Sequence, residues 1–193
     1  MILTCEEQQL AFSIVRNSID HGFDHDAARL YDPALFSDKF KLLSQVFVSL
    51  KYKGVSVGCQ GNFGDSLPFY KALSNCSFNA GFNDPRFPAI NKNILSQLVI
   101  SIHLLGNTNS TSAIFDIEEF CSKLDSDDCV LLRSHDKKAF FLSSVQSEYT
   151  TKMLFMLALK NKANIDNKTP WYFLNATTVK TLSTYSQSYQ DTQ

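Results

Sequence analysis

Two short segments carry the side chains best suited to chemistry. Residues 58–61 read Gly-Cys-Gln-Gly, and residues 84–88 read Asp-Pro-Arg-Phe-Pro. Because glycines let the backbone approach a ligand closely, the thiol of Cys59 is a candidate nucleophile or redox group. The guanidinium of Arg86 can hold a carboxylate or phosphate through two parallel hydrogen bonds, and the flanking prolines restrict its position.

Each of these residues also has a structural interpretation. Cys59 can be a small buried apolar side chain in a tight turn. Arg86 can form an internal salt bridge, with Asp84 as the nearest partner, that fixes its loop. Activation of Cys59 requires a cation, a helix N-terminus or a histidine nearby. His103 lies in an apolar strand and becomes the best general-base candidate if it points toward Cys59.

Two further groups could hold a metal by residue type alone. His21 and His25 are one helical turn apart, a spacing that can bind a divalent cation on a helix. Gly22 is expected to interrupt that helix, so we predict a solvated polar turn. The three aspartates of residues 125–128 lack the glycine and the glutamate of a calcium loop, and a charged turn is expected there. We therefore predict no metal, and without a phosphate-binding glycine motif we predict no cofactor.

Composition narrows the class of protein. The chain has 193 residues, 44 % of them apolar, which is enough for one hydrophobic core. Eighteen basic and 19 acidic residues give a net charge of −1, so we expect neither nucleic acid nor a membrane as partner. The longest apolar runs fall short of the ~20 residues that span a bilayer, and no secretory signal is recognised. Five cysteines without a Cys-x-x-Cys pair predict a reduced, cytoplasmic protein.

The first half of the chain contains the elements that position the two segments. Thr4 and Glu7 form a capping box for a helix that Gly22 would end. A strand from residue 46 turns back at Lys53-Gly54 in a hairpin, which delivers residues 58–61 at its exit. Ser66 is expected to cap a helix that reaches residue 80, and residues 84–88 form a rigid loop.

The second half alternates strands and helices. We predict a strand over residues 98–105, a flexible loop over 106–112, a short helix from Asp116 and a hairpin around 135–137. A helix then runs from Thr150 or Thr151 to about Asn164, followed by strands at 171–174 and 178–185 and a frayed tail over 187–193. The fold class is α+β, with an antiparallel or mixed β-sheet flanked by helices. Residues 1–193 are expected to form one compact domain, with two lobes as an open alternative.

Three segments together resemble the AMMECR-type domain family, named for the human protein of the Alport-syndrome midface-hypoplasia chromosomal region. Residues 47–54 are similar to its strand-turn segment, residues 58–61 to its Leu-Arg-Gly-Cys-Ile-Gly signature, and residues 80–88 to its Ala-Phe-x-Asp-x-Arg-Phe-Pro loop. This chain departs from the family pattern at four positions. Val57 replaces an arginine, Gln60 an isoleucine, Ser143 a proline and Asn164 a glycine.

The resemblance implies a compact α+β domain with a cleft beside the Gly-Cys segment, and no settled chemistry. Our first hypothesis is a small anionic ligand in a cleft between residues 58–61 and residues 84–88, with Cys59 and His103 as catalytic candidates. The predicted ligand-binding residues are Gly58, Gly61, Asp84 and Arg86. The second hypothesis is a non-catalytic interaction module. Because bacterial and archaeal relatives are often associated with Memo-type and radical-SAM proteins, a Memo-type protein is then the expected partner.

Overall fold

The computed structural model describes residues 1–63 and 67–190, except for the side chains of 107–110. The chain divides into two compact units. The first comprises Met1–Leu105 and Leu182–Gln193, and the second comprises Gly106–Thr181. In the described part of the chain, no helix is both long and apolar enough to cross a membrane.

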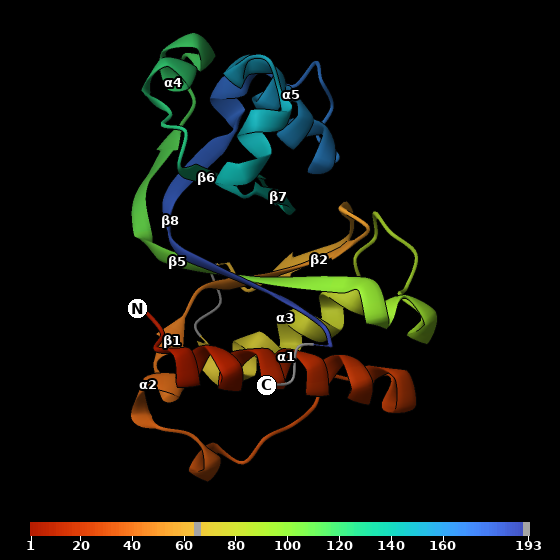
Figure 1. The fold of residues 1–193 in the computed structure, drawn as a ribbon. Helices are drawn as coiled ribbons and strands as arrows, with labels where there is room; N and C mark the ends of the chain where they lie inside the picture. The colour runs from red at the N-terminus through yellow and green to blue at the C-terminus, as the bar shows by residue number, and fades with distance from the viewer. Residues whose placement is uncertain (64–66, 191–193) are drawn as a thin grey trace. The chain divides into compact units, whose positions relative to one another are not determined.

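The first unit contains most of the predicted functional residues. Its helices are α1 (Cys5–His25), η1 (Pro33–Leu35), α2 (Asp38–Lys41), α3 (Phe69–Phe82) and η2 (Lys92–Gln97). Its strands are β1 (Leu43–Ser44), β2 (Val46–Tyr52), β3 (Val55–Gly61) and β4 (Leu67–Pro68). Two long strands, β5 (Leu98–Ala113) and β8 (Asn175–Ser188), belong partly to this unit and partly to the second (Figure 1).

The second unit is smaller. It contains α4 (Ile117–Lys123), β6 (Asp128–Ser134), β7 (Lys137–Phe141), η3 (Ser143–Glu148), α5 (Lys152–Lys162) and η4 (Trp171–Phe173). The main sheet has the strand order β3-β2-β5-β8-β6-β7, and β1 pairs with β4 in a small second sheet. The pairs β2–β3, β2–β5, β6–β7 and β6–β8 are antiparallel. The predicted α+β class with an antiparallel sheet is therefore confirmed.

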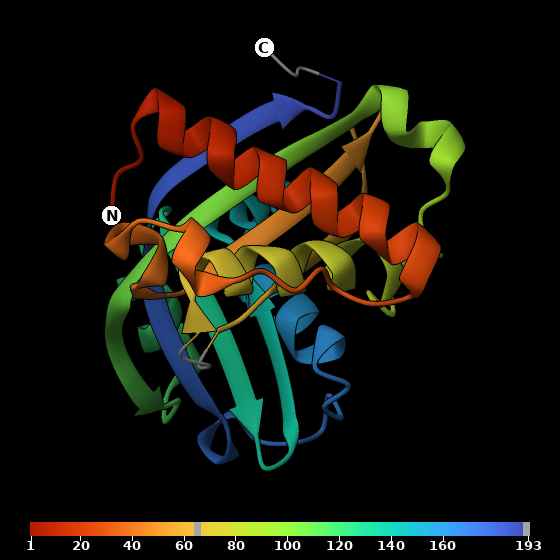
Figure 2. The same cartoon turned by 90° about the horizontal axis from the view of Figure 1, so that it is seen from below.

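Helix α1 begins as predicted and ends later. Thr4 and Glu7 form the reciprocal capping box, but the helix continues past Gly22 to a C-cap at Asp26, whose φ is 51°. A Cβ on Gly22 would overlap the ring of Phe82, so this glycine allows α1 to lie close to α3. Figure 2 shows the two helices together on one face of the sheet. The prediction that Gly22 stops the helix was wrong because its role is tertiary packing.

Alternation along β2 and β5 separates two faces of the sheet. Val48, Leu50, Ile100 and Ile102 are buried in a core with α1 and α3. Their neighbours in sequence point to the opposite face, because successive strand residues alternate. That second face carries the residues that could do chemistry.

Local signals predicted several elements correctly. Lys53 and Gly54 adopt positive φ values of 49° and 81° in the β2–β3 turn, and His135 (φ 50°) lies in the β6–β7 turn. Thr151 caps α5, and Asn164, with φ 54°, lies just beyond its end. Glycine adopts that left-handed conformation without strain, and asparagine tolerates it better than most other residues.

Three predicted elements differ in the structure. The expected loop at 106–112 is part of β5, where the Thr111 hydroxyl contacts the Thr177 hydroxyl at 2.9 Å. Threonine is polar but β-branched, and β-branched residues are favoured in strands. The expected strand at 171–174 is the 3-10 helix η4, which follows Pro170. The expected frayed tail begins within β8, which extends to Ser188. The predicted cap Ser66 and residues 191–193 lie outside the described residues.

Candidate functional site

A β-bulge in the β2–β3 hairpin determines the direction of the Cys59 side chain. Tyr52 pairs with Val55 and Lys51 with Ser56, but the register then shifts, and Ser49 pairs with Cys59. Val57 is the extra residue that this shift leaves over. Without it the two-residue turn would place Cys59 opposite Val48, on the face that packs against the helices. The bulge therefore moves the thiol to the opposite face.

On that face a row of polar side chains crosses four strands. The Ser49 hydroxyl donates to the Cys59 sulfur over 3.3 Å, and its oxygen lies 3.0 Å from Nε2 of His103. Nδ1 of His103 lies 3.0 Å from the hydroxyl of Thr184. Because the single Ser49 proton is directed at sulfur, His103 donates from Nε2 and accepts from Thr184 at Nδ1. The row thus forms one directional chain of hydrogen bonds that ends at the thiol.

His103 is held in its neutral form by its surroundings. Its side chain is buried, and burial, with a smaller contribution from the charge of Lys51, lowers the pKa of His103 to about 4. A neutral imidazole has one donor and one acceptor nitrogen, which matches its two hydroxyl partners. From the sequence, His103 was a candidate base on the condition that it points toward Cys59. In the structure it reaches the sulfur only through Ser49.

The Asp84–Arg86 pair attaches the rigid loop to the same strand. Oδ2 of Asp84 accepts the backbone N–H of Cys59 at 2.9 Å and Nη2 of Arg86 at 2.6 Å. Oδ1 accepts both Nε of Arg86, at 3.0 Å, and its backbone N–H, at 3.1 Å. Nη2 of Arg86 also donates to the carbonyl of Cys59 at 3.3 Å. The internal salt bridge considered from the sequence is therefore present.

This pair substitutes for a neighbouring strand. β3 is the edge of the sheet, where backbone groups are left without a partner strand. Asp84 accepts from the N–H of Cys59 and Arg86 donates to its C=O, as a partner strand would. The two predicted segments consequently meet by direct hydrogen bonds at this point.

Charge and burial oppose each other within the pair. Burial alone would raise the pKa of Asp84, but hydrogen bonds from Arg86 and the Cys59 N–H outweigh it, and the pKa is lowered. For Arg86, burial acts to lower the pKa, and the contacts with Asp84 and then Cys59 raise it. The guanidinium lies within electrostatic reach of the thiol.

The two glycines of residues 58–61 are explained by packing. A Cβ on Gly58 would overlap the carbonyl oxygen of Ala80 in α3, and one on Gly61 would overlap the ring of Phe47. Both were predicted as ligand contacts. The space that their missing side chains leave is taken by the protein itself, so their residue type is accounted for without a ligand.

Sequence reasoning missed Ser49 and Thr184. Ser49 lies between buried Val48 and Leu50, so its position on the opposite face was available from the strand alternation. Its contact with Cys59 depended on the bulge, which no local pattern indicated. Thr184 lay in a predicted strand, but nothing in the sequence paired that strand with His103.

In the second unit, Lys180 lies among three aspartates. Its Nζ lies 2.8 Å from Asp125, 2.6 Å from Asp127 and 3.0 Å from Asp128. These carboxylates raise the pKa of Lys180, and the largest cause is the hydrogen bond that Lys180 donates to Asp125. The ammonium group thus pairs with all three carboxylates.

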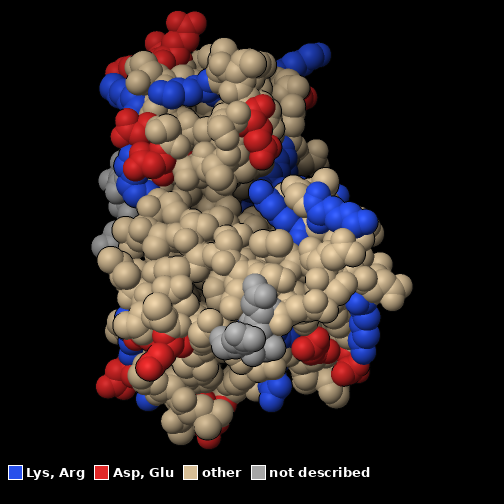
Figure 3. Space-filling view, in the orientation of Figure 1, with Lys and Arg blue, Asp and Glu red and all other residues tan. Residues whose placement is uncertain are grey.

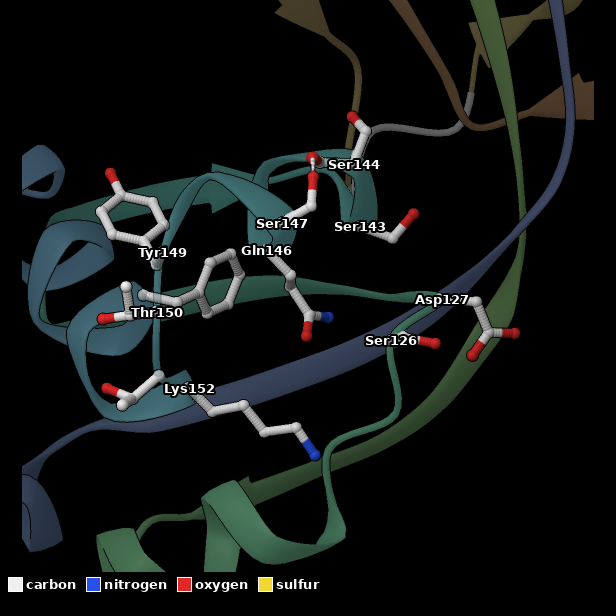
Figure 4. Close-up of a pocket in the computed structure, with 11 residues that line it drawn as sticks. Ser126, Asp127, Ser143, Ser144, Gln146, Ser147, Tyr149, Thr150 and Lys152 are labelled. Atoms are coloured by element: carbon white, nitrogen blue, oxygen red, sulfur yellow. Dashed lines mark hydrogen bonds between the residues drawn. The ribbon is translucent and has the colours of Figure 1, made fainter.

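A hollow of about 480 Å³ also lies within the second unit (Figure 4). Its wall comes from η3, the start of α5 and the turn before β6, and it is rich in hydroxyl groups. None of the predicted site residues lines it.

On the surface seen in Figure 3, basic and acidic side chains are interspersed.

Comparison with known proteins identifies the family. The family model AMMECR1 matches residues 9–184. The chain belongs to the AMMECR1 family. The bulged hairpin and the Asp84–Arg86 pair both lie within the part of this chain that the family model matches. The comparison with curated proteins gives no match.

The fold is also similar to a solved structure. The crystal structure of an uncharacterized protein from Pyrococcus horikoshii superimposes with a TM-score of 0.77 at 17 % identity. The alignment covers 94 % of this chain and 91 % of the other. At this identity the likeness establishes the fold alone, and the chemistry has to be argued from the residues of this AMMECR1 domain.

Proposed function

We propose that this AMMECR1 domain binds a small anionic ligand at the edge strand β3, with Arg86 holding the anion and the Cys59 thiol in contact with it. One observation carries the proposal. The sulfur of the partly exposed Cys59 receives a hydrogen bond from the Ser49 hydroxyl. The same hydroxyl is hydrogen-bonded to the buried, neutral His103. Unlike the buried Cys129, whose sulfur also has hydrogen-bond partners, the Cys59 thiol is partly exposed and lies within electrostatic reach of the Arg86 guanidinium.

Arg86 retains hydrogen-bonding capacity for a ligand. Its Nε and Nη2 are used within the protein, and Nη1 has no hydrogen-bond partner among the described residues. The side chain is 36 % exposed, so this free end reaches solvent. The salt bridge with Asp84 fixes the guanidinium plane, which reduces the entropy lost when an anion binds.

Accessibility separates Cys59 from most of the other cysteines. Cys76, Cys121 and Cys129 are buried, Cys5 is exposed, and Cys59 is intermediate. A reagent or ligand can therefore reach Cys59 in the folded protein, whereas the three buried thiols require the structure to open. Arg86 places a positive charge beside the accessible sulfur.

Site-resolved alkylation with iodoacetamide tests the proposal. We expect Cys59 to be modified far faster than the three buried cysteines at neutral pH. Ser49→Ala removes one hydrogen bond to sulfur, worth about 0.5–1.5 kcal/mol. It should slow the alkylation of Cys59 about two- to tenfold and leave the alkylation rate of Cys5 unchanged. Equal, slow labelling of Cys59 and Cys129 in the native protein would reject the site.

The second candidate is a non-catalytic interaction module, with a Memo-type protein as the partner suggested by the family resemblance. It is favoured by large apolar side chains exposed near α2. Leu30, Leu35, Leu42 and Leu43 are 86, 72, 57 and 65 % exposed. If this candidate holds, substitution of these leucines will abolish partner binding, and substitution of Cys59 will leave it intact.

A further inference from the structure

We infer that His21 and His25, in the last turns of α1, form a binding site for a borderline divalent cation such as Zn²⁺ or Ni²⁺. The sequence favoured a solvated turn here because Gly22 and a loop-like flank were expected to end the helix, and because a metal site also needs ordered groups around its ligands. The structure removes the first of these objections, because α1 is helical through His25 and is capped at Asp26.

The two imidazoles lie next to each other on one face of the helix. Residues four apart on a helix project from the same face, one turn above the other. Their ring centroids are 4.2 Å apart, with an angle of 33° between the ring planes. The His-x-x-x-His spacing on a helix is the one by which helical zinc sites bring two ring nitrogens to one ion.

Both rings are available to an ion. His21 is partly buried and His25 is exposed. Within residues 1–63 and 67–190, neither imidazole has a hydrogen bond or an ion pair. The two rings thus contact each other. A bound cation would use ring nitrogens that have no hydrogen bond to another group of the described chain.

The end of the helix contributes negative charge at this position. The rings lie at the C-terminal end of a 21-residue helix, where free carbonyl groups concentrate negative charge. The carboxylate of Asp24 is paired with Lys92 at 3.1 Å, and that of Asp20 accepts the Tyr189 hydroxyl at 2.7 Å. These carboxylates already have partners, so the two histidines supply the protein ligands.

The ligand set determines the class of ion. Neutral imidazole nitrogens suit Zn²⁺, Ni²⁺ and Cu²⁺, whereas Mg²⁺ and Ca²⁺ require oxygen ligands. Two protein ligands leave the other coordination positions to water or to a donor group from a partner molecule. The site is therefore an open surface site rather than a closed structural one.

Titration calorimetry with Ni²⁺ tests the inference. Because Cys5 and Cys59 are accessible thiols, all proteins should carry Cys5→Ser and Cys59→Ser. We expect one Ni²⁺ per chain, and a loss of affinity of at least about tenfold in both His21→Asn and His25→Asn. His135→Asn, in the β6–β7 turn, is the matched control and should bind as the parent does.

A second measurement uses the link between binding and stability. Ni²⁺ should raise the melting temperature of the parent and of His135→Asn, and should leave both α1 variants unchanged, because only the folded helix holds the two rings together. Mg²⁺ at the same concentration should have no effect. Absence of saturable Ni²⁺ binding in the parent, or binding that survives both α1 substitutions, would overturn the inference.

Discussion

Each unit of the molecule contains a cysteine whose sulfur is hydrogen-bonded to neighbouring strands and loops. In the first unit the Cys59 sulfur receives the Ser49 hydroxyl at 3.3 Å. In the second unit the Cys129 sulfur accepts the backbone N–H of Ser143 at 3.2 Å and contacts the Thr181 hydroxyl at 3.1 Å. The Cys129 sulfur therefore has more hydrogen-bond partners than the Cys59 sulfur.

The difference between them lies in access and charge. Cys129 is fully buried, and burial raises the pKa of its thiol in spite of its hydrogen-bond partners. Cys59 is partly exposed and lies beside the guanidinium of Arg86. Hydrogen bonds to sulfur therefore do not by themselves mark a reactive site; a route for reagent and a nearby cation distinguish Cys59.

Gly58→Ala should produce the largest difference in alkylation between Cys59 and Cys129. The added methyl group would overlap the Ala80 carbonyl and push β3 away from α3. We expect a loss of about 3 kcal/mol, or a fall of about 6–12 °C in melting temperature, measured by circular dichroism. Under native conditions alkylation of Cys59 should accelerate while Cys129 remains protected.

Gly54→Ala is the control for this variant. A Cβ there meets nothing within 4 Å, so only the strain of a φ of 81° remains, about 1–2 kcal/mol. If Gly54→Ala destabilises as much as Gly58→Ala, the close approach of β3 to α3 is not what Gly58 provides. If Gly58→Ala accelerates the alkylation of Cys59 and Cys129 equally, the substitution loosens the whole fold rather than β3 alone.

Asp84→Asn tests how the edge strand is held. The neutral amide cannot pair with Arg86, and we expect a loss of about 2–3 kcal/mol at pH 7. The pKa of Asp84 is lower in the folded protein than in the unfolded chain. Its stabilising contribution is therefore complete above the unfolded value of about 4 and is lost as pH falls through the lowered folded value.

The measurement is urea unfolding of both proteins between pH 7 and pH 2.5. The stability difference between the parent and Asp84→Asn should shrink toward the acid end of that range. Asp38→Asn, at a fully exposed carboxylate, should show no such trend. A difference that stays constant across the range would mean that the Asp84 charge does not stabilise the fold.

Ser143→Pro should have the smallest effect. It restores the residue usual in the family and removes the N–H donor to Cys129. Ser143 is the first residue of η3, and Leu142 before it is extended (φ −68°, ψ 154°), so the backbone suits proline. We expect a change within about 0.5 kcal/mol and continued protection of Cys129. Exposure of Cys129 would show that this hydrogen bond, rather than burial, keeps it inert.

Much of the fold could be predicted because its signals are local. The Thr4–Glu7 capping box, the Lys53-Gly54 turn and the Thr151 cap each depend on a few adjacent residues, and each is confirmed. Gly22 was misread because the atoms that require a glycine there belong to Phe82, far away in sequence. Local patterns cannot report such a contact.

The candidate site was only partly predictable for the same reason. Cys59, Asp84 and Arg86 were recognised from their types and flanking residues, and their mutual contacts agree with the expectation that the two segments meet. The partner of the sulfur, Ser49, depends on the extra residue Val57 in the hairpin. A one-residue change of register reverses every side chain beyond it, and the same two-residue turn without the extra residue would give the other register.

The most direct test of the central claim is whether an anion protects the thiol. Cys59 alkylation should be followed in increasing inorganic phosphate and citrate, at constant ionic strength, in the parent and in Arg86→Gln, with Arg133→Gln as a surface control. We expect saturable protection of Cys59 in the parent and in the control, no protection of Cys5, and no protection of Cys59 in Arg86→Gln. Unprotected Cys59 in the parent, or protection that persists in Arg86→Gln, would contradict it.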